Sequence, residues 1–173
     1  MKKFLVIGNP IDHSLSPKLH NYWIKKNNID AIYEKKLLEE KDLETLCNKI
    51  REGKIDGVNV TVPFKEKIIK YIDVLSEDAF NSKAVNIIYK KSENGEDKLI
   101  GDNTDIYGFK KSLPKLFRVI GGGSIGAIIL GAGGASRAII IALSHLGINT
   151  FAIINRTKSK AIKLMHEIDP ENY

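Results

Sequence analysis

The sequence predicts an α/β fold in which strands and helices alternate along the whole chain. Short apolar runs of strand length are separated by stretches with helical spacing of apolar residues, a pattern typical of parallel sheets. A glycine-rich turn, Gly131–Ser136, stands between an apolar run and a helix-like stretch. No apolar run reaches the roughly 18 to 20 residues that a membrane-spanning helix needs. The basic then apolar N-terminus ends at Gly8, so we interpret it as a first strand and expect a cytoplasmic protein.

The first hundred residues are predicted to form one α/β domain. Ser16 is expected to cap the first helix, with Pro17 at the first helical position. The expected strands are Phe4–Ile7, Ala31–Leu37, Gly57–Val62 and a hairpin of Val85–Lys91 with Lys98–Asp102 that turns at Asn94-Gly95. The other expected helices are Asp42–Arg51, with Leu43, Leu46, Cys47 and Ile50 inward, and a helix from Pro63 through Tyr71.

The second part of the chain is predicted to begin a second βαβ unit. Thr104 is expected to cap a helix, and Gly121–Ser124 is interpreted as a flexible link. The expected strands are Ala127–Leu130 and Phe151–Ile154, and the expected helices are Ala135–Leu146 and Ser159–His166. We therefore expect two domains, residues 1–103 and 104–173.

Charge and cysteine content exclude several classes of function. The formal net charge of +6 is concentrated after Asp102, where 9 Lys and Arg face 4 Asp and Glu. These basic residues form no dense run with interleaved aromatics, so we expect no nucleic-acid partner, and a solvated basic surface is the alternative. The single Cys47 excludes an intrachain disulfide and a cysteine-rich metal cluster, and its helical spacing favours a buried core thiol.

The glycine-rich turn is a candidate dinucleotide site because it stands between a strand and a helix. Gly131 permits the tight turn, Gly133 allows a pyrophosphate to approach the backbone, and the helix N-terminus supplies amide donors. A tight turn without a ligand is the alternative. The candidate cofactor contacts in this turn are Gly131, Ala132, Gly133, Gly134, Ala135 and Ser136.

The segment after the next predicted strand favours NADP over NAD. NAD sites usually place Asp or Glu at this point to hold the ribose 2′-hydroxyl, whereas this chain has Asn155, Arg156, Thr157 and Lys158. A carboxylate would repel a 2′-phosphate, while arginine and nearby hydroxyls bind it with charge-assisted hydrogen bonds. A solvated charge at a helix start is the alternative interpretation of Arg156.

Polar residues also gather at the predicted strand ends of the first domain. Ser14 and Ser16 share one face of an extended segment before a helix, which suits a carboxylate ligand, although Ser16 as a cap alone is equally consistent. Lys65 lies just beyond a strand end, where α/β folds place ligands. Asp102 ends another strand, and a Lys–Asp pair in a cleft can move protons. His13 is interpreted as a structural residue, because consecutive Asp12, His13 and Ser14 cannot form a catalytic relay.

An ordered series of motifs resembles the signature of shikimate dehydrogenases. The series is Gly8–Ile11, His13–Pro17, His20-Asn21, Asn59–Lys65, Ala84–Asn86, Gly101–Asp105, Gly108-Phe109, Gly131–Arg137 and Asn155–Thr157. The resemblance covers essentially the whole chain. It implies an N-terminal α/β substrate-binding domain followed by the first half of a Rossmann-type dinucleotide-binding domain. Its implied activity is the reversible NADPH-dependent reduction of 3-dehydroshikimate to shikimate in aromatic amino-acid biosynthesis.

The resemblance also implies roles for individual residues. Ser14 and Ser16 would hold the substrate carboxylate with Thr61 nearby, and Asn86, Asp102 and Lys65 would bind the ring hydroxyls. Lys65 is the expected general acid and base, with Asp102 positioning it, although a mainly orienting role for Lys65 stays open. Two residues depart from the family pattern: Lys83 stands where glycine is usual, and Ile87 replaces a threonine.

The resemblance implies that the chain stops partway through its cofactor domain. We therefore expect a truncated product or fragment that is weakly active at best alone. The alternatives are an NAD-using quinate/shikimate dehydrogenase and an inactive module that only binds shikimate. We expect a small-molecule substrate, no metal and no membrane partner, and leave a homodimer open.

Overall fold

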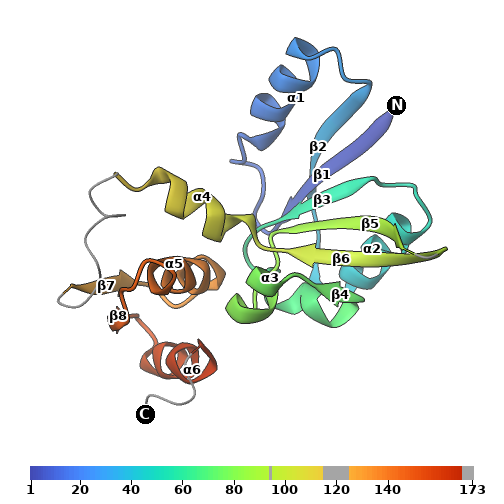
Figure 1. Cartoon of the computed structure of the whole chain (residues 1–173). Coiled ribbons are helices and arrows are strands. Elements are labelled where there is room, and N and C mark those ends of the chain that lie inside the picture. Colours follow the sequence, from blue (N-terminus) through green and yellow to red (C-terminus); the bar gives the residue numbers. More distant parts are fainter. Residues whose placement is uncertain (94, 115–124, 169–173) are drawn as a thin grey trace. The chain divides into compact units, whose positions relative to one another are not determined.

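The chain forms two compact units in a computed structural model, which describes residues 1–93, 95–114 and 125–168 (Figure 1). The first unit contains residues 1–76 and 85–102, and the second contains residues 77–84 and 103–173. The division places residues 77–84 with the second unit, which the sequence patterns did not indicate. Both units are α/β in composition, as predicted.

A six-stranded mixed sheet forms the centre of the first unit, in the order β2-β1-β3-β5-β6-β4. Its strands are β1 (Lys2–Gly8), β2 (Ala31–Leu37), β3 (Gly57–Val60), β4 (Val74–Leu75), β5 (Ile87–Glu93) and β6 (Glu96–Asp102). Strand β1 is parallel to β2 and β3, while β5 is antiparallel to both β3 and β6. The predicted hairpin is therefore confirmed as β5–β6, although Asn94 of its predicted turn lies outside the described residues.

Two α-helices and two short 3-10 helices complete the first unit. They are α1 (Ser16–Lys26), α2 (Leu43–Arg51) and the 3-10 helices Glu40–Asp42 and Lys67–Tyr71. Helix α2 buries the predicted apolar face, Leu43, Leu46, Cys47 and Ile50. Burial raises the pKa of the Cys47 thiol to about 11, so this residue is a protonated core side chain as expected.

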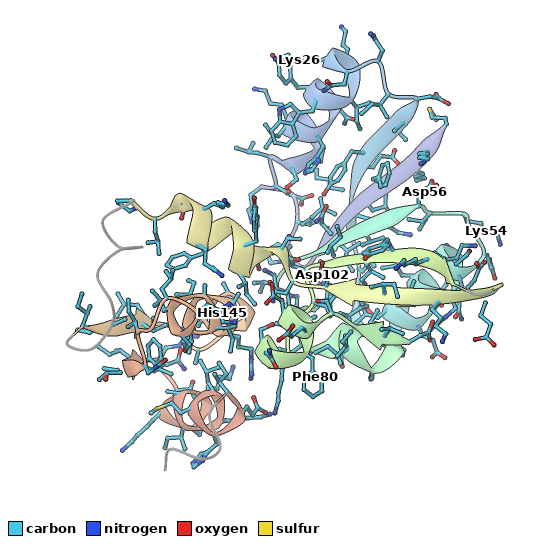
Figure 2. The ribbon with its side chains drawn as sticks, in the orientation of Figure 1. Lys26, Lys54, Asp56, Phe80, Asp102 and His145 are labelled. Carbon is cyan, nitrogen blue, oxygen red and sulfur yellow. The ribbon has the colours of Figure 1, made fainter. Side chains whose placement is uncertain are left out.

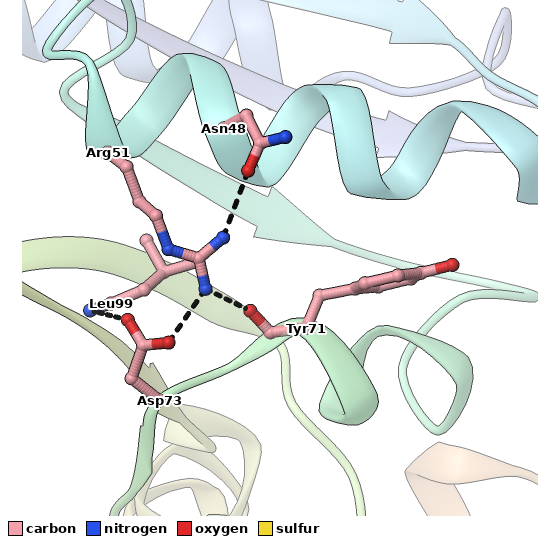
Figure 3. Close-up of polar contacts among 5 residues, drawn as sticks. All are labelled: Asn48, Arg51, Tyr71, Asp73 and Leu99. Carbon is pink, nitrogen blue, oxygen red and sulfur yellow. Dashed lines mark hydrogen bonds and ion pairs between the residues drawn. The ribbon is translucent and has the colours of Figure 1, made fainter.

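An ion-pair cluster ties α2 to the connection between the second 3-10 helix and β4 (Figure 3). The Arg51 guanidinium donates to Asp73 Oδ1 at 2.7 Å and to the Tyr71 carbonyl at 2.8 Å. The other Asp73 carboxylate oxygen accepts from the Leu99 backbone N–H at 2.7 Å. The hydrogen bond from Arg51 is the main cause that lowers the pKa of Asp73. The contribution of this ion pair to the stability of the unit is therefore fully present at pH values above the ordinary pKa of an aspartate. It is lost as the pH falls through the lowered pKa of Asp73.

In its described residues, the second unit contains a two-stranded parallel sheet and four helices. Its elements are α3 (Glu77–Ser82), α4 (Thr104–Ser112), β7 (Gly126–Leu130), α5 (Gly134–Ser144), β8 (Thr150–Ile154) and α6 (Lys158–Ile168). Strands β7 and β8 pair from Gly126 with Thr150 to Leu130 with Ile154. One face of the pair packs in a core with the helices through Ile129, Ile140 and Leu164. This order of strand, helix, strand and helix is the predicted second βαβ unit.

The other face of the β7–β8 pair is apolar and exposed. Ile128, Leu130 and Ile154 alternate with buried or half-buried neighbours, and their exposed fractions are 70%, 78% and 59%. Parallel sheets are usually covered on both faces. Within the described ranges, only one face of this pair is covered.

Three details of the helix starts differ from the prediction. Ser16 is not a cap: α1 begins at Ser16, and the residue at the cap position is Leu15, which makes no side-chain hydrogen bond to the helix. Thr104 is the first residue of α4, and Asn103 is the cap because its side chain accepts from the Asp105 N–H at 3.1 Å. The helix expected from Pro63 is wrong over its first turn, since only Lys67–Tyr71 is helical, as a 3-10 helix.

Lys83 has a backbone conformation that favours glycine. Its φ is 48°, in the left-handed region that costs a residue with a Cβ roughly 1–2 kcal/mol. At this departure from the family pattern, the backbone of the second unit is therefore strained.

We expect Lys83→Gly to raise the free energy of unfolding by about 1 kcal/mol, because glycine removes most of this strain. The measurement is urea unfolding followed by circular dichroism. Lys83→Ala is the matched control: it removes the same charge but keeps the Cβ, so it should give no gain. Equal gains from both variants would assign the effect to the charge and contradict the strain.

Candidate active site

One edge of the six-stranded sheet collects the predicted substrate residues of the first unit. Because β5 runs opposite to β3 and β6, its start lies beside their ends. The register places Ile87 opposite both Asn59 and Asp102. Thr61 follows β3, Asn86 precedes β5 and Asp102 ends β6, so the three lie along this edge; Figure 2 shows Asp102 at its strand end.

Backbone hydrogen bonds fix this edge. The Asn86 carbonyl accepts from Val60 N–H at 2.8 Å, and Asn86 N–H donates to the Asp102 carbonyl at 2.9 Å. Val85 N–H donates to the Lys65 carbonyl at 2.8 Å. The backbones of Lys65 and Asp102 are therefore held by two consecutive residues, Val85 and Asn86. Ile87, the second departure from the family pattern, stands next to them in the same row.

Asp102 has a neighbour that the sequence motifs did not indicate. The Ser76 hydroxyl donates to Asp102 Oδ1 at 2.5 Å. A hydroxyl that donates here fixes the direction of the Asp102 carboxylate. The sequence did not indicate this contact, because Ser76 follows β4, a strand of two residues that is too short to show an alternating pattern.

Ser14 and Ser16 lie in the segment between β1 and α1. Ser14 Oγ accepts from the Ser16 backbone N–H at 3.3 Å, and Ser14 N–H donates to the Ile11 carbonyl at 3.0 Å. Both side chains are half-buried. The two hydroxyls are thus close together at the start of α1, where helix amides favour an anion.

Gly8 brings β1 into close contact with Thr61. A Cβ at Gly8 would lie 2.6 Å from Thr61 Cγ2 and 3.0 Å from the Val62 carbonyl oxygen. The end of β1 and the segment that follows β3 can approach this closely only because position 8 has no side chain.

We expect Gly8→Ala to lower the free energy of unfolding by about 1–3 kcal/mol, the usual cost of overpacking. Thermal and urea unfolding measure it. Adding Thr61→Ser removes the clashing Cγ2 and keeps the hydroxyl, so the double variant should recover part of the loss. A double variant no more stable than Gly8→Ala would contradict the contact as the cause.

The second unit places its predicted cofactor residues at one end of the β7–β8 pair. Both strands are parallel and end in register at Leu130 and Ile154, so the segments that follow them are neighbours. Gly131 has a φ of 109° and its N–H donates to the Ile154 carbonyl at 2.8 Å. The glycine predicted for a tight turn is therefore required there. Gly133 precedes α5, with open space where a Cβ would be.

The segment after β8 presents its basic side chains to solvent. The Asn155 side chain donates to the Thr157 carbonyl at 2.8 Å, which closes a short turn before α6. Arg156, Thr157 and Lys158 are exposed. The turn, the glycine-rich loop and the start of α5 together fit a phosphate-bearing dinucleotide, because they combine backbone amides with positive charge.

Two residues of this unit are structural. Arg137, in α5, is almost fully buried and forms an ion pair with Glu167 of α6. Burial opposes ionisation of Glu167, but the hydrogen bond from Arg137 prevails and lowers the pKa of this carboxyl. Arg137 thus joins α5 to α6.

A cavity of about 900 Å³ lies elsewhere in the second unit, among α3, α5, β8 and α6. Phe80 and His145, both labelled in Figure 2, line it together with Phe151 and Met165. It includes Thr150 at the start of β8, whereas parallel α/β units bind ligands at the carboxyl ends of their strands. None of the predicted site residues lines this cavity, so we do not assign the cofactor to it.

The described part of the chain offers no candidate for two other kinds of site. Among these residues, no group of three or more His, Cys, Asp or Glu is arranged to hold a metal ion. No helix within the described ranges is both long and apolar enough to cross a membrane.

The fold and these sites define an α/β protein with a mixed-sheet unit and a partial Rossmann-type unit. Residues 6–88 match the family model described as "Shikimate dehydrogenase substrate binding domain". A curated "Shikimate dehydrogenase (NADP(+))" of Pelagibacter ubique (strain HTCC1062) is 55% identical over 163 residues, which cover 94% of this chain and 59% of the relative. Over almost its whole length, the chain is therefore similar to shikimate dehydrogenases, and residues 6–88 match their substrate-binding domain.

Solved structures of shikimate dehydrogenases are similar to the chain as well. A shikimate dehydrogenase from Aquifex aeolicus is similar over 96% of this chain and 60% of its own length, with a TM-score of 0.83 and 40% identity. A shikimate 5-dehydrogenase from Thermus thermophilus, in complex with NADP(H) and shikimate, has a TM-score of 0.79 and 33% identity over 97% of this chain and 61% of its own. The chain thus spans about three fifths of the length of these relatives.

Proposed function

We propose that the chain carries the substrate site and part of the cofactor site of an NADP-dependent shikimate dehydrogenase. The reaction would be the reversible reduction of 3-dehydroshikimate to shikimate in aromatic amino-acid biosynthesis. The main support is the row of Thr61, Asn86 and Asp102 along one sheet edge, with Lys65 attached to the same backbone network. Residues 1–103 would be the substrate domain and residues 104–173 part of the NADP domain.

In this proposal, each predicted residue keeps the role that the resemblance implies. Ser14 and Ser16 bind the substrate carboxylate near the start of α1, with Thr61 beside them. Asn86 and Asp102 bind ring hydroxyls, and Ser76 holds the Asp102 carboxylate in place.

Lys65 is proposed to handle the proton of the reaction. NADPH, when bound, supplies the hydride that reaches the substrate carbonyl carbon. Lys65 gives a proton to the carbonyl oxygen as it becomes the hydroxyl, and takes it back in the reverse direction. Asp102 orients both Lys65 and the substrate.

The proposed cofactor contacts are the glycine-rich loop and the turn after β8. The loop, Gly131–Ser136, receives the pyrophosphate at the start of α5. Asn155, Arg156, Thr157 and Lys158 bind the 2′-phosphate. NAD lacks that phosphate, so turnover with NADP compared with NAD distinguishes this proposal from the NAD-using quinate/shikimate dehydrogenase.

The test is calorimetric titration with shikimate and with NADP, combined with an assay of NADP reduction by shikimate. Binding of both and measurable turnover support the dehydrogenase. A module that only binds shikimate is the second candidate, and it predicts binding without turnover. If shikimate does not bind, both proposals fail.

The cellular setting belongs to the same proposal. A cytoplasmic location is supported by the single cysteine, which is buried. Oligomeric state stays open between a monomer and a homodimer, and sedimentation velocity distinguishes them.

A further inference from the structure

Tyr33 of β2 joins α1 to the end of β3 within the first unit. Its hydroxyl donates to Asn59 Oδ1 at 2.7 Å, and its side chain is only 4% exposed. Burial raises the pKa of this phenol to about 12, so it remains a hydrogen-bond donor at any ordinary pH.

Helix α1 holds Tyr33 from the other side. The His20 imidazole stacks on the Tyr33 ring, with centroids 4.2 Å apart and planes 5° from parallel. The Asn21 side chain donates to the Tyr33 carbonyl at 2.7 Å and accepts from its N–H at 3.0 Å. The His20-Asn21 pair, which the proposed function does not use directly, therefore fixes both the ring and the backbone of Tyr33.

Asn59 extends this chain of contacts to the proposed substrate site. Its amide group donates to the Asn86 carbonyl at 3.4 Å. That carbonyl also accepts from Val60 N–H. Asn59 precedes Thr61 by two residues, and Asn86 is itself a proposed substrate ligand. The Tyr33 hydroxyl thus fixes a side chain that spans β3 and the start of β5.

We propose that Tyr33 is a positioning residue that sets the Ser14–Ser16 segment and α1 against Thr61 and Asn86. This inference rests on the proposed function, because it assumes that these residues bind shikimate. The physical basis is that a small displacement of a substrate-binding side chain removes much of its contribution to binding. Tyr33 acts through Asn59 on one side and through His20 and Asn21 on the other, and in this proposal it does not touch the substrate.

Tyr33→Phe isolates the hydroxyl, since it keeps the ring that stacks on His20. We expect the variant to weaken shikimate binding about tenfold. The reason is that half-buried Asn59 loses the hydrogen bond from the Tyr33 hydroxyl and is no longer held in place. Tyr89→Phe is the matched control on β5 of the same sheet. The described residues include no hydrogen-bond partner for the Tyr89 hydroxyl, so its loss should leave binding unchanged.

A double-mutant cycle separates positioning from general stability. In an Asn59→Ala background, Tyr33→Phe should have little further effect on shikimate affinity, because its target is already absent. Equal losses in both backgrounds, or wild-type affinity in Tyr33→Phe, would overturn the inference while leaving the proposed function in place.

Hydrogen exchange gives a readout that needs no ligand. The Val60 and Asn86 amides, both in backbone bonds at the site edge, should exchange faster in Tyr33→Phe than in wild type, while those of α2 stay unchanged. Unchanged exchange at both amides overturns the inference. If wild type does not bind shikimate, the proposed function fails, and this measurement still decides the role of Tyr33.

Discussion

Replacing Lys65 by alanine is expected to lower kcat for shikimate oxidation at least about 100-fold, the usual scale for losing a general acid–base group. The reason is that Lys65 is the one residue proposed to transfer the proton between the enzyme and the reacting oxygen of the substrate. Steady-state assays with NADP measure it against wild type under identical conditions.

The matched control is Lys67→Ala, two residues further on. Lys67 pairs with Glu40 at 2.5 Å, and both side chains are largely exposed. Surface ion pairs of this kind contribute little to the free energy of unfolding. The Lys67→Ala variant should therefore keep the wild-type kcat. Near-normal turnover in Lys65→Ala would contradict the proton role and favour a purely orienting lysine.

Replacing Arg156 by glutamate is expected to weaken NADP binding about 100-fold. The change removes a charge-assisted hydrogen bond to the 2′-phosphate and adds a like charge beside it. Calorimetry with NADP measures the loss, and NAD serves as the internal comparison because it has no such phosphate.

Lys160→Glu is the control for net charge. It makes the same change of charge at an exposed position of α6, outside the turn after β8, so it should affect NADP binding only slightly. A similar loss in both variants would show that overall charge, rather than contact with Arg156, governs binding.

The elements that the sequence predicted well are those with a periodic pattern. Helix α2 has four buried positions at helical spacing, and β2 was predicted with its observed bounds. By contrast, α3 has six residues and β4 has two. Elements this short offer no full period from which to predict them.

The errors at helix starts have a local cause. Ser16 and Thr104 are both favourable cap residues, but each is the first residue of its helix and not the residue before it. At α4 the preceding residue, Asn103, is an equally good cap, so composition alone does not choose between neighbours. At α1 the Ser14 side chain accepts the Ser16 N–H, a bond that depends on how the preceding loop turns.

The residues proposed to bind the substrate could be predicted from the sequence, but the residues that hold them in place could not. Asn59–Lys65 and Gly101–Asp105 could be recognised as strand ends, whose polar residues meet in an α/β sheet. Ser76 on Asp102 and Tyr33 on Asn59 join residues 26 positions apart in each case. Contacts at such separations follow from the order of strands in the sheet, which no single segment encodes.

The β5–β6 pairing has a practical consequence for labelling the protein. Seven pairs in register connect Glu93 and Glu96 at the hairpin tip to Ile87 and Asp102 at the other end. At about 3.4 Å per residue, the tip lies roughly 20 Å from Asp102. A fluorophore or tag inserted at Gly95 would therefore stay remote from the site. One residue inserted within β5 would instead turn every following side chain to the opposite face of the sheet.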